Sequence, residues 1–237
     1  MTFRTWFNEF IAEYDFSELY ETETSGYFKG ITTAGTDYWN IHLDMLEEYD
    51  IDNADKDIKI LDIGVWFGVL PFALQQYGFK NVRTTECLAH SQAKQESFQV
   101  LHPYFGIEPS ELHILPQQTF DLGEKFDLIT VMKSNVFWKT GDVIKYDGTN
   151  VTTEWQVPGA DGKIHTFFTL YTPEDWEFFI NNIRQHLNPG GSALINPEPW
   201  CYDRIETLAK TRQYLEQYKQ TTFDYGHQLQ NFLVIEA

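Results

Sequence analysis

A short stretch near residue 60 constrains the fold more than any other part of the chain. Residues Ile58 to Ile63 form a mainly apolar run, glycines follow at Gly64 and Gly68, and an apolar-periodic segment continues to Leu74. This order predicts a buried strand, a tight glycine turn and a helix. Glycine lets the backbone turn sharply and approach a ligand, and the helix N-terminus that follows presents unpaired N–H groups. We therefore expect a turn that binds a nucleotide-like ligand.

The residues around the turn narrow the class of ligand. A dinucleotide-binding turn reads Gly-x-Gly-x-x-Gly, whereas here Asp62 lies two residues before Gly64 and Gly68 lies four residues after it. This spacing resembles the first motif of class I S-adenosylmethionine (SAM)-dependent methyltransferases. The resemblance implies that this turn holds the methionine part of SAM and that S-adenosylhomocysteine is the product. Trp66 stands where the family usually has a further glycine, and we expect its indole to pack beside the cofactor.

A second acidic residue follows at the spacing that is typical of a residue that binds ribose. Asn81 to Glu86 predicts a short strand, and Glu86 lies about twenty residues past the glycines. In Rossmann-like sheets this position is the carboxyl end of the second strand, where a carboxylate accepts hydrogen bonds from the ribose hydroxyls. We assign that role to Glu86, with a solvated loop charge as the alternative. Cys87 would border the cofactor through its backbone.

The third and fourth strands are expected to add contacts at the same edge. Glu111 to Leu115 predicts the third strand, and in the turn after it the resemblance implies an adenine contact by Gln117 or Gln118. Residues 123–133 resemble the fourth strand of the family, and their continuous apolar character suits a central strand. Ligands bind at the carboxyl ends of strands in open α/β sheets. There we assign Lys133 to the cofactor and Asn135 to the substrate.

The last third completes the pattern. Thr172-Pro173 predicts a helix start. The segment that follows is similar to the family's stretch leading into the fifth strand: a helix, then Leu187-Asn-Pro-Gly-Gly, then the strand Ser192 to Asn196. A further helix, then Thr221 to Tyr225 and Phe232 to Ala237, would supply the sixth strand and an antiparallel seventh. The expected fold is therefore α/β: a seven-stranded, mostly parallel sheet of order 3-2-1-4-5-7-6, with the last strand antiparallel and helices on its faces.

We expect two additions to this domain of residues 56–237. Residues 1–55 predict an N-terminal helical cap: residues 1–24 and 38–49 each show one apolar helix face, and the glycines of 25–36 predict a loop. The resemblance implies that such a cap folds over the cofactor and helps to form the substrate pocket. We assign Tyr27 and Tyr38 to the substrate, and we expect Trp39 to cover the sheet.

The second addition is an insertion over residues 140–170, after the fourth strand. Its Asp147-Gly148 and Asp161-Gly162 turn signals lie between β-prone runs and predict one or two hairpins. Because it leaves the carboxyl edge of the sheet, we interpret it as a substrate lid, with a decorative hairpin as the alternative.

Composition limits the partners. The formal charge of −18 repels phosphate backbones and anionic membrane surfaces. We therefore expect no nucleic-acid or membrane partner. We also expect a cytoplasmic protein, because the 237 residues contain no apolar stretch long enough to cross a bilayer and no secretory pattern. The two cysteines form no disulfide framework or metal spacing, so no metal site is predicted.

The sequence specifies the catalytic residues less well than the fold or the cofactor site. Methyl transfer needs a positioned acceptor, and a general base only where the acceptor holds a proton at neutral pH. His165 in the lid is our first candidate base, Glu198 after the fifth strand is a second base or a substrate anchor, and His186 is expected to cap a helix. The predicted function is transfer of a methyl group from SAM to an oxygen or nitrogen of a small molecule. A non-catalytic SAM-binding regulator and an NAD-dependent oxidoreductase are the alternatives.

Overall fold

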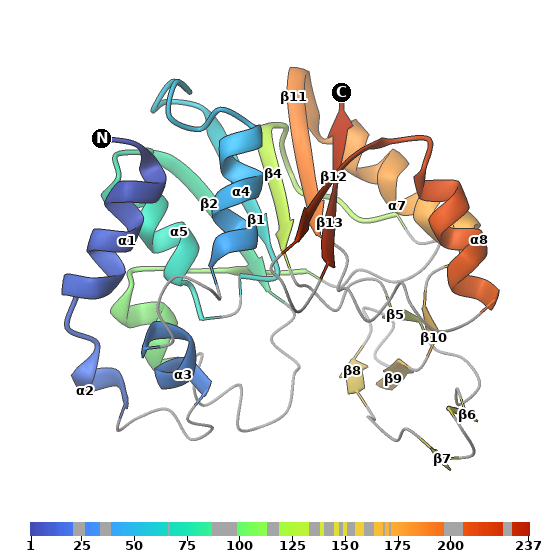
Figure 1. Ribbon diagram of the computed structural model, residues 1–237, viewed down its shortest axis with the longest axis horizontal. Helices are drawn as coiled ribbons and strands as arrows, with labels where there is room; N and C mark the ends of the chain where they lie inside the picture. The colour runs from blue at the N-terminus through green and yellow to red at the C-terminus, as the bar shows by residue number, and fades with distance from the viewer. Residues whose placement is uncertain are drawn as a thin grey trace.

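A sheet with helices on both faces forms the centre of the structure (Figure 1). The computed structural model describes residues 1–20, 27–33, 39–65, 67–86, 99–112, 119–132, 138–139, 145–146, 149–150, 155–158, 164–167, 169–170, 172–196, 206–224 and 229–237. The helices are α1 (Phe3–Glu13), α2 (Ser17–Tyr20), α3 (Tyr27–Thr33), α4 (Asn40–Glu48), α5 (Val69–Gln76), α7 (Pro173–Gln185) and α8 (Glu206–Leu215). Residues 99–104 are also helical.

The main sheet has the strand order β12-β13-β11-β4-β1-β2-β3. Its strands are β1 (Lys59–Ile63), β2 (Asn81–Glu86), β3 (Ser110–Glu111), β4 (Phe126–Met132), β11 (Leu187–Asn196), β12 (Lys219–Asp224) and β13 (Leu229–Glu236). β3, β2, β1, β4 and β11 run parallel, and β13 is antiparallel to both of its neighbours. Numbered along the chain, this order is 3-2-1-4-5-7-6, as expected. The details differ: β3 is described at two residues, and β11 begins five residues before the predicted strand.

Side chains alternate along each strand and divide the core into two layers. In β1, Ile60 belongs to one buried cluster, whereas Leu61 and Ile63 belong to the other. The first cluster lies between the sheet and α1, α4 and α5, and the second lies between the sheet and α7 and α8. The helices of residues 1–55 are therefore part of the same core as the sheet.

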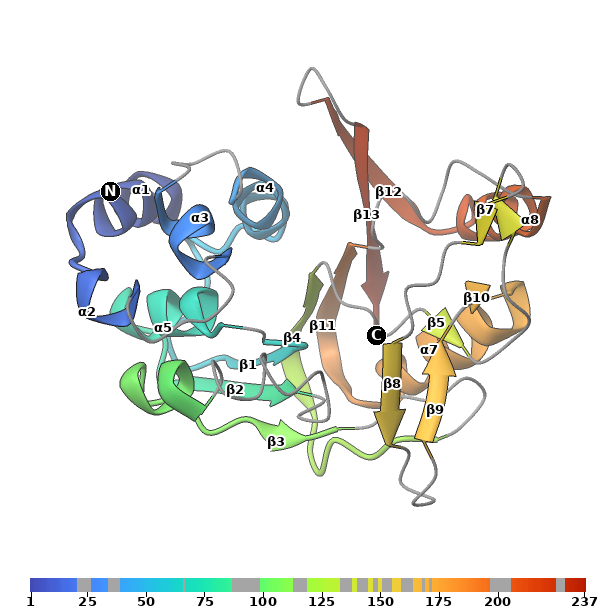
Figure 2. The same cartoon turned by 90° about the horizontal axis from the view of Figure 1, so that it is seen from below.

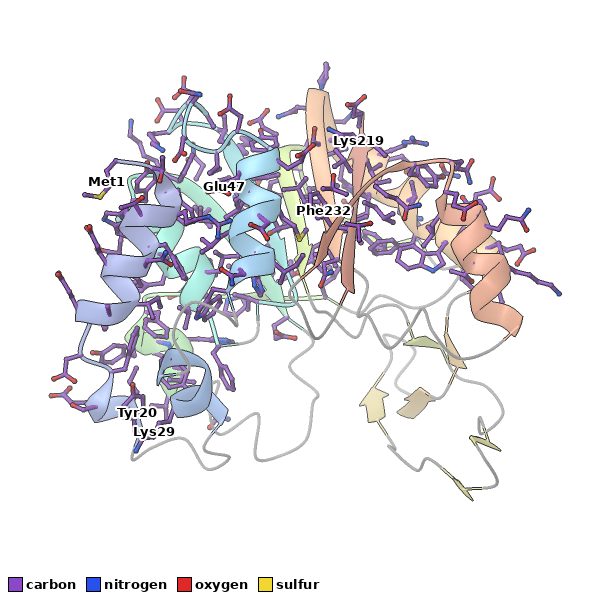
Figure 3. The ribbon with its side chains drawn as sticks, in the orientation of Figure 1. Met1, Tyr20, Lys29, Glu47, Lys219 and Phe232 are labelled. Atoms are coloured by element: carbon purple, nitrogen blue, oxygen red, sulfur yellow. The ribbon has the colours of Figure 1, made fainter. Side chains whose placement is uncertain are left out.

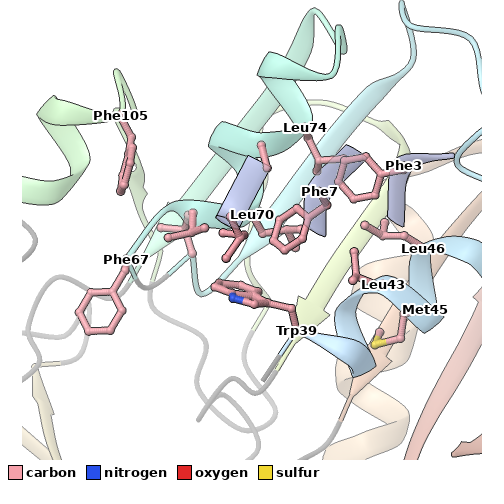
Figure 4. Packing of buried hydrophobic residues seen from close by; sticks show 14 of the residues in the cluster. Phe3, Phe7, Trp39, Leu43, Met45, Leu46, Phe67, Leu70, Leu74 and Phe105 are labelled. Carbon is pink, nitrogen blue, oxygen red and sulfur yellow. The ribbon is translucent and has the colours of Figure 1, made fainter. Parts of the chain in front are cut away.

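The N-terminal helices pack through aromatic and aliphatic side chains. Figure 4 shows Phe7 of α1, Leu43 of α4 and Leu70 of α5 meeting around the Trp39 indole. Trp39 is buried and its ring lies 5.4 Å from that of Phe7. Trp39 therefore packs among the helices on this face of the sheet, and its contact with the sheet itself stays a prediction.

Polar contacts fix the ends of α1 and its place beside α4. Thr2 caps α1, and the helix ends at Glu13 because Tyr14 takes an extended conformation. The predicted helical segment of residues 1–24 is thus divided into α1 and α2. Arg4 of α1 forms ion pairs with Asp44 and Glu47 of α4, the latter labelled in Figure 3.

The segment before α4 differs from its prediction. The glycines of residues 25–36 predict a loop, but α3 is a helix that contains Gly30. Phe28 is fully buried, and its ring lies 5.6 Å from that of Phe67 and 6.3 Å from that of Phe105. Burying a phenylalanine contributes roughly 1.5–3 kcal/mol, which exceeds the roughly 1 kcal/mol by which glycine disfavours a helix. The loop prediction is wrong because this tertiary contact outweighs local propensity.

The start of α7 and the strand after it follow from their sequences. Thr172 and Asp175 form a reciprocal capping box, with Pro173 in the first turn. β11 begins directly at the end of α7 and includes the predicted Pro-Gly-Gly turn, with a register shift against β4. A Cβ atom on Gly191 would lie 2.9 Å from the carbonyl oxygen of Phe126, so only glycine allows this approach.

The insertion forms hairpins, as predicted. β6 (Lys145–Tyr146) pairs with β7 (Thr149–Asn150), β8 (Trp155–Pro158) pairs with β9 (Ile164–Phe167), and β5 (Trp138–Lys139) pairs with β10 (Thr169–Leu170) at the base. These strands lie beyond the carboxyl ends of the parallel strands. They are below α7 and α8 in Figure 1, and in Figure 2 they lie on the same side of the molecule as α7 and α8. None of the helices in the described ranges has the length and apolar character needed to cross a bilayer.

Candidate functional site

The turn after β1 is tied to the neighbouring strand by its backbone. The N–H groups of Gly64 and Val65 donate to the carbonyl oxygen of Thr85, at 2.9 and 3.1 Å. Gly64 has a φ of +78° and Gly68, the N-cap of α5, has a φ of +83°, values that favour glycine. A Cβ atom on Gly68 would also lie 2.6 Å from Cδ1 of Ile107. Both predicted glycines are therefore required by the geometry of the turn.

Asp62 lies in β1, two residues before Gly64, and is buried inside the structure. It is 5% exposed, and the hydroxyl of Thr130 donates a hydrogen bond to its Oδ1 at 2.6 Å. Burial raises the pKa of Asp62 to about 6, and the Thr130 hydrogen bond opposes that shift. The Asp62 carboxyl group therefore loses its proton at a higher pH than an exposed aspartate does.

Glu86 is the last residue of β2, the predicted place at the carboxyl end of the second strand. Its carbonyl oxygen accepts a hydrogen bond from the N–H of Leu112 at 3.1 Å, beside its pairing with Glu111 of β3. The residue is 5% exposed, which contradicts the alternative of a solvated loop charge. The ribose contact itself stays a prediction.

Buried polar side chains form a row across three adjacent strands. Asp62 is in register with Thr84 of β2 on one side and with Thr130 of β4 on the other. All three are buried. By strand alternation they face the layer of α1, α4 and α5, since Ile60 and Leu128, two residues earlier, both lie in that cluster. We call these three residues the polar row.

Further buried polar groups lie one level closer to the carboxyl edge. Glu86 and Asn196 end β2 and β11 on the same face as the polar row, and both are buried. Gly64 follows β1 at this level, between these two residues. Because glycine has no side chain, a ligand can approach the β1 backbone between Glu86 and Asn196.

A buried histidine covers the same face. Tyr49, at the end of α4, donates from its hydroxyl to the carbonyl oxygen of Asp127 at the start of β4. His42 lies seven residues before Tyr49, about 10 Å along a helix, and Thr130 lies three residues after Asp127, about 10 Å along a strand. Because α4 runs antiparallel to β4 (Figure 1), His42 lies at about the level of the polar row. It is buried, with its ring 5.2 Å from that of Trp39.

Thr84, Thr130, Asn196 and His42 are not among the site residues predicted from the sequence. The available signal was weak: Thr130 is a hydroxyl inside an otherwise apolar strand, and Asn196 is an amide at the end of another. Assigning them to one site requires the register between strands that are far apart in the chain.

The remaining predicted residues are placed only in part. Tyr27 begins α3 and His165 lies on β9 opposite Val157, and for both the structure describes the backbone alone. His186 caps α7, as expected: its Nδ1 lies 2.8 Å from the carbonyl oxygen of Asn182, and its Nε2 accepts from the N–H of Leu122 at 3.2 Å. Eight predicted residues lie outside the described ranges: Tyr38, Trp66, Cys87, Gln117, Gln118, Lys133, Asn135 and Glu198.

Comparisons with known proteins bear on the fold. No protein-family model matches the chain, and no curated protein matches its sequence. Among solved structures, DesVI from Streptomyces venezuelae is similar over 95% of this chain and 100% of its own, at 12% identity and a TM-score of 0.52. The N-methyltransferase NodS from Bradyrhizobium japonicum covers 85% of this chain and 98% of its own, at 14% identity and a TM-score of 0.47.

A ribosomal protein L11 methylase from Lactobacillus delbrueckii is similar over 83% of this chain and 78% of its own, at 15% identity and a TM-score of 0.46. Of these three structures, DesVI alone exceeds a TM-score of 0.5, and at such identities a likeness shows only the fold. Together with the strand order of the sheet, it shows that the chain has a Rossmann-like α/β fold, a mixed sheet with helices on both faces.

Proposed function

We propose that this chain is a SAM-dependent methyltransferase that transfers a methyl group to an oxygen or nitrogen of a small-molecule acceptor. The observation that carries the proposal is the pair of buried carboxyl groups, Asp62 and Glu86, at the carboxyl ends of adjacent parallel strands. Between them the chain makes a glycine turn in which Gly64 and Gly68 both have positive φ angles. Carboxylates at such an edge suit a ligand that carries hydroxyl donors or positive charge.

SAM has both features. Its ribose hydroxyls would donate to Glu86, and its ammonium and sulfonium groups would lie near the negative charge of Asp62. The formal charge of −18 also favours a cationic ligand at long range.

A dinucleotide fits this turn less well. Its pyrophosphate needs unpaired N–H groups at a helix N-terminus, and α5 has Pro71, which lacks an N–H, in its first turn. Asp62, buried two residues before Gly64, would repel a pyrophosphate at this turn when ionised. These observations favour SAM over NAD.

The acceptor is proposed to bind between the N-terminal helices and the insertion. α3, which begins at Tyr27, and the hairpins of residues 140–170 both lie beyond the carboxyl ends of the parallel strands (Figure 1). We propose that the insertion acts as a lid over the methyl group, with His165 or Glu198 as the base where the acceptor carries a proton.

Calorimetry with SAM, S-adenosylhomocysteine and NAD tests the cofactor. We expect binding of the first two, and we expect Glu86→Gln to weaken SAM binding roughly tenfold to hundredfold through loss of charge-assisted hydrogen bonds. Glu13→Gln, which removes an exposed acid of α1, is the matched control and should bind SAM like the parent.

No heat at millimolar SAM would refute the cofactor assignment, and binding of NAD instead would support the oxidoreductase. Methyl transfer is tested by incubating the protein with labelled SAM and a small-molecule extract of the producing cells. SAM binding without a labelled product would favour a regulatory role.

A further inference from the structure

The hydrogen bond between Thr130 and Asp62 joins two strands at the centre of the sheet. Thr130 is fully buried, and its Oγ1 lies 2.6 Å from Oδ1 of Asp62. This distance is typical of a hydroxyl that donates to an ionised carboxylate. Within the described ranges, Thr130 is the one hydrogen-bond donor to this carboxyl group.

The hydroxyl of Thr130 can donate a hydrogen bond whether Asp62 is ionised or protonated. The same Oγ1 lies 3.4 Å from the carbonyl oxygen of Leu61. When Asp62 is ionised, the Thr130 proton points to the carboxylate. When Asp62 is protonated, its own O–H can donate to Thr130, whose proton then turns to Leu61. The shorter contact is the charge-assisted one, so this hydroxyl favours the ionised carboxylate.

We propose that Thr130 is a positioning residue of the site: its hydroxyl holds the Asp62 carboxylate in one orientation and keeps it ionised for a cationic ligand. The ligand's identity as SAM rests on the proposed function, but the effect of Thr130 on Asp62 does not.

Other titratable groups also face this layer of the structure. Glu86 lies on the same face of β2, His42 lies on α4, and His102 of the helical segment 99–104 lies beside Gly68. α5 contains no titratable side chain. Because an ionised Glu86 disfavours the Asp62 charge and a protonated histidine favours it, the test must observe Asp62 itself.

The test compares Thr130→Val, Thr130→Ser and Thr84→Val. Valine has nearly the shape of threonine without the hydroxyl, and serine retains the hydroxyl. Thr84 is the matched control, because it flanks Asp62 in the same row, also buried, with no hydrogen bond between these two described side chains. The carboxyl ¹³C shift of Asp62, assigned with Asp62→Asn, is followed against pH in the ligand-free proteins.

We expect Thr130→Val to raise the Asp62 titration midpoint by roughly one to two pH units. Thr130→Ser and Thr84→Val should titrate close to the parent. Equal midpoints in Thr130→Val and the parent, or equal shifts in both valine variants, would overturn the proposal.

SAM affinity, measured against pH, provides the second readout. Thr130→Val should lose about tenfold in affinity near pH 6.5 and much less near pH 8.5, where its Asp62 is again ionised. A loss equal at all pH values would indicate a packing role and contradict the proposal. If the parent protein binds no SAM, the proposed function fails, and the titration of Asp62 still decides the role of Thr130.

Discussion

Replacing Asp62 by asparagine should change how the protein's stability depends on pH. Burial raises the pKa of Asp62 to about 6 from an ordinary value of 3.8, so the folded state holds this proton more tightly than the unfolded state. Unfolding therefore releases a proton between about pH 4 and pH 6. The free energy of unfolding falls as pH rises through that window and levels off above it. Asp62→Asn has no such proton to release.

The size of the effect follows from the shift. A shift of 3.8 to about 6 corresponds to about 3 kcal/mol, at about 1.4 kcal/mol for each pKa unit. The parent protein loses roughly half of this free energy of stabilisation between pH 5 and pH 8, because the folded state releases most of the extra bound proton in that range. The stability of Asp62→Asn relative to the parent should therefore increase by about 1.5 kcal/mol over this range, whatever constant offset the new amide introduces.

Urea denaturation of both proteins at pH 5, 6.5 and 8 measures this difference. Working at pH 5 and above avoids the isoelectric point of about 4.6. The Glu13→Gln control, at an exposed acid, should follow the parent. If the stability of Asp62→Asn relative to the parent stayed constant with pH, or increased toward pH 5, the folded state would not raise this pKa.

Three further predictions concern the turn and the insertion. Gly68→Ala should lower the free energy of unfolding by roughly 2–4 kcal/mol, because it combines positive-φ strain with a contact to Ile107. Gly106→Ala, with a φ of +64° and open space around it, should lose only about 1 kcal/mol in the same urea assay, and equal losses would exclude the contact. Replacing residues 140–170 by a short Gly-Ser turn should spare SAM affinity in calorimetry and abolish methyl transfer, and retention of the parent rate would contradict the lid. His165→Ala should reduce the transfer rate about a hundredfold, with KM for SAM little changed, and an unaltered rate would remove it as the base.

The sequence predicted those parts of the fold that depend on local pattern. The apolar run before Gly64, the acid at Glu86 and the capping box at Thr172 each indicate an element without reference to distant residues, and the structure places all three elements as expected. The prediction was wrong for α3, where the buried contacts of Phe28 outweigh a glycine in the helix.

The polar row could not be predicted, because it depends on register. Asp62, Thr84 and Thr130 come from three strands, and a shift of one residue in either pairing would place a threonine on the opposite face. Parallel strands have no shared hairpin turn to set their register, which follows from packing of the whole sheet. His42 similarly becomes a site candidate only when α4 is known to run antiparallel to β4.

The place of β13 has a consequence for how the protein folds. β13 lies between β11 and β12, both of which precede it in the chain, and it contributes the buried residues Phe232, Leu233 and Ile235. Until β13 enters, β11 presents an unpaired edge that can capture a strand from another molecule. Mutual repulsion of molecules carrying a formal charge of −18 opposes that encounter. Refolding yield should therefore fall as salt screens the charge, with intermolecular aggregation through this edge as the competing reaction.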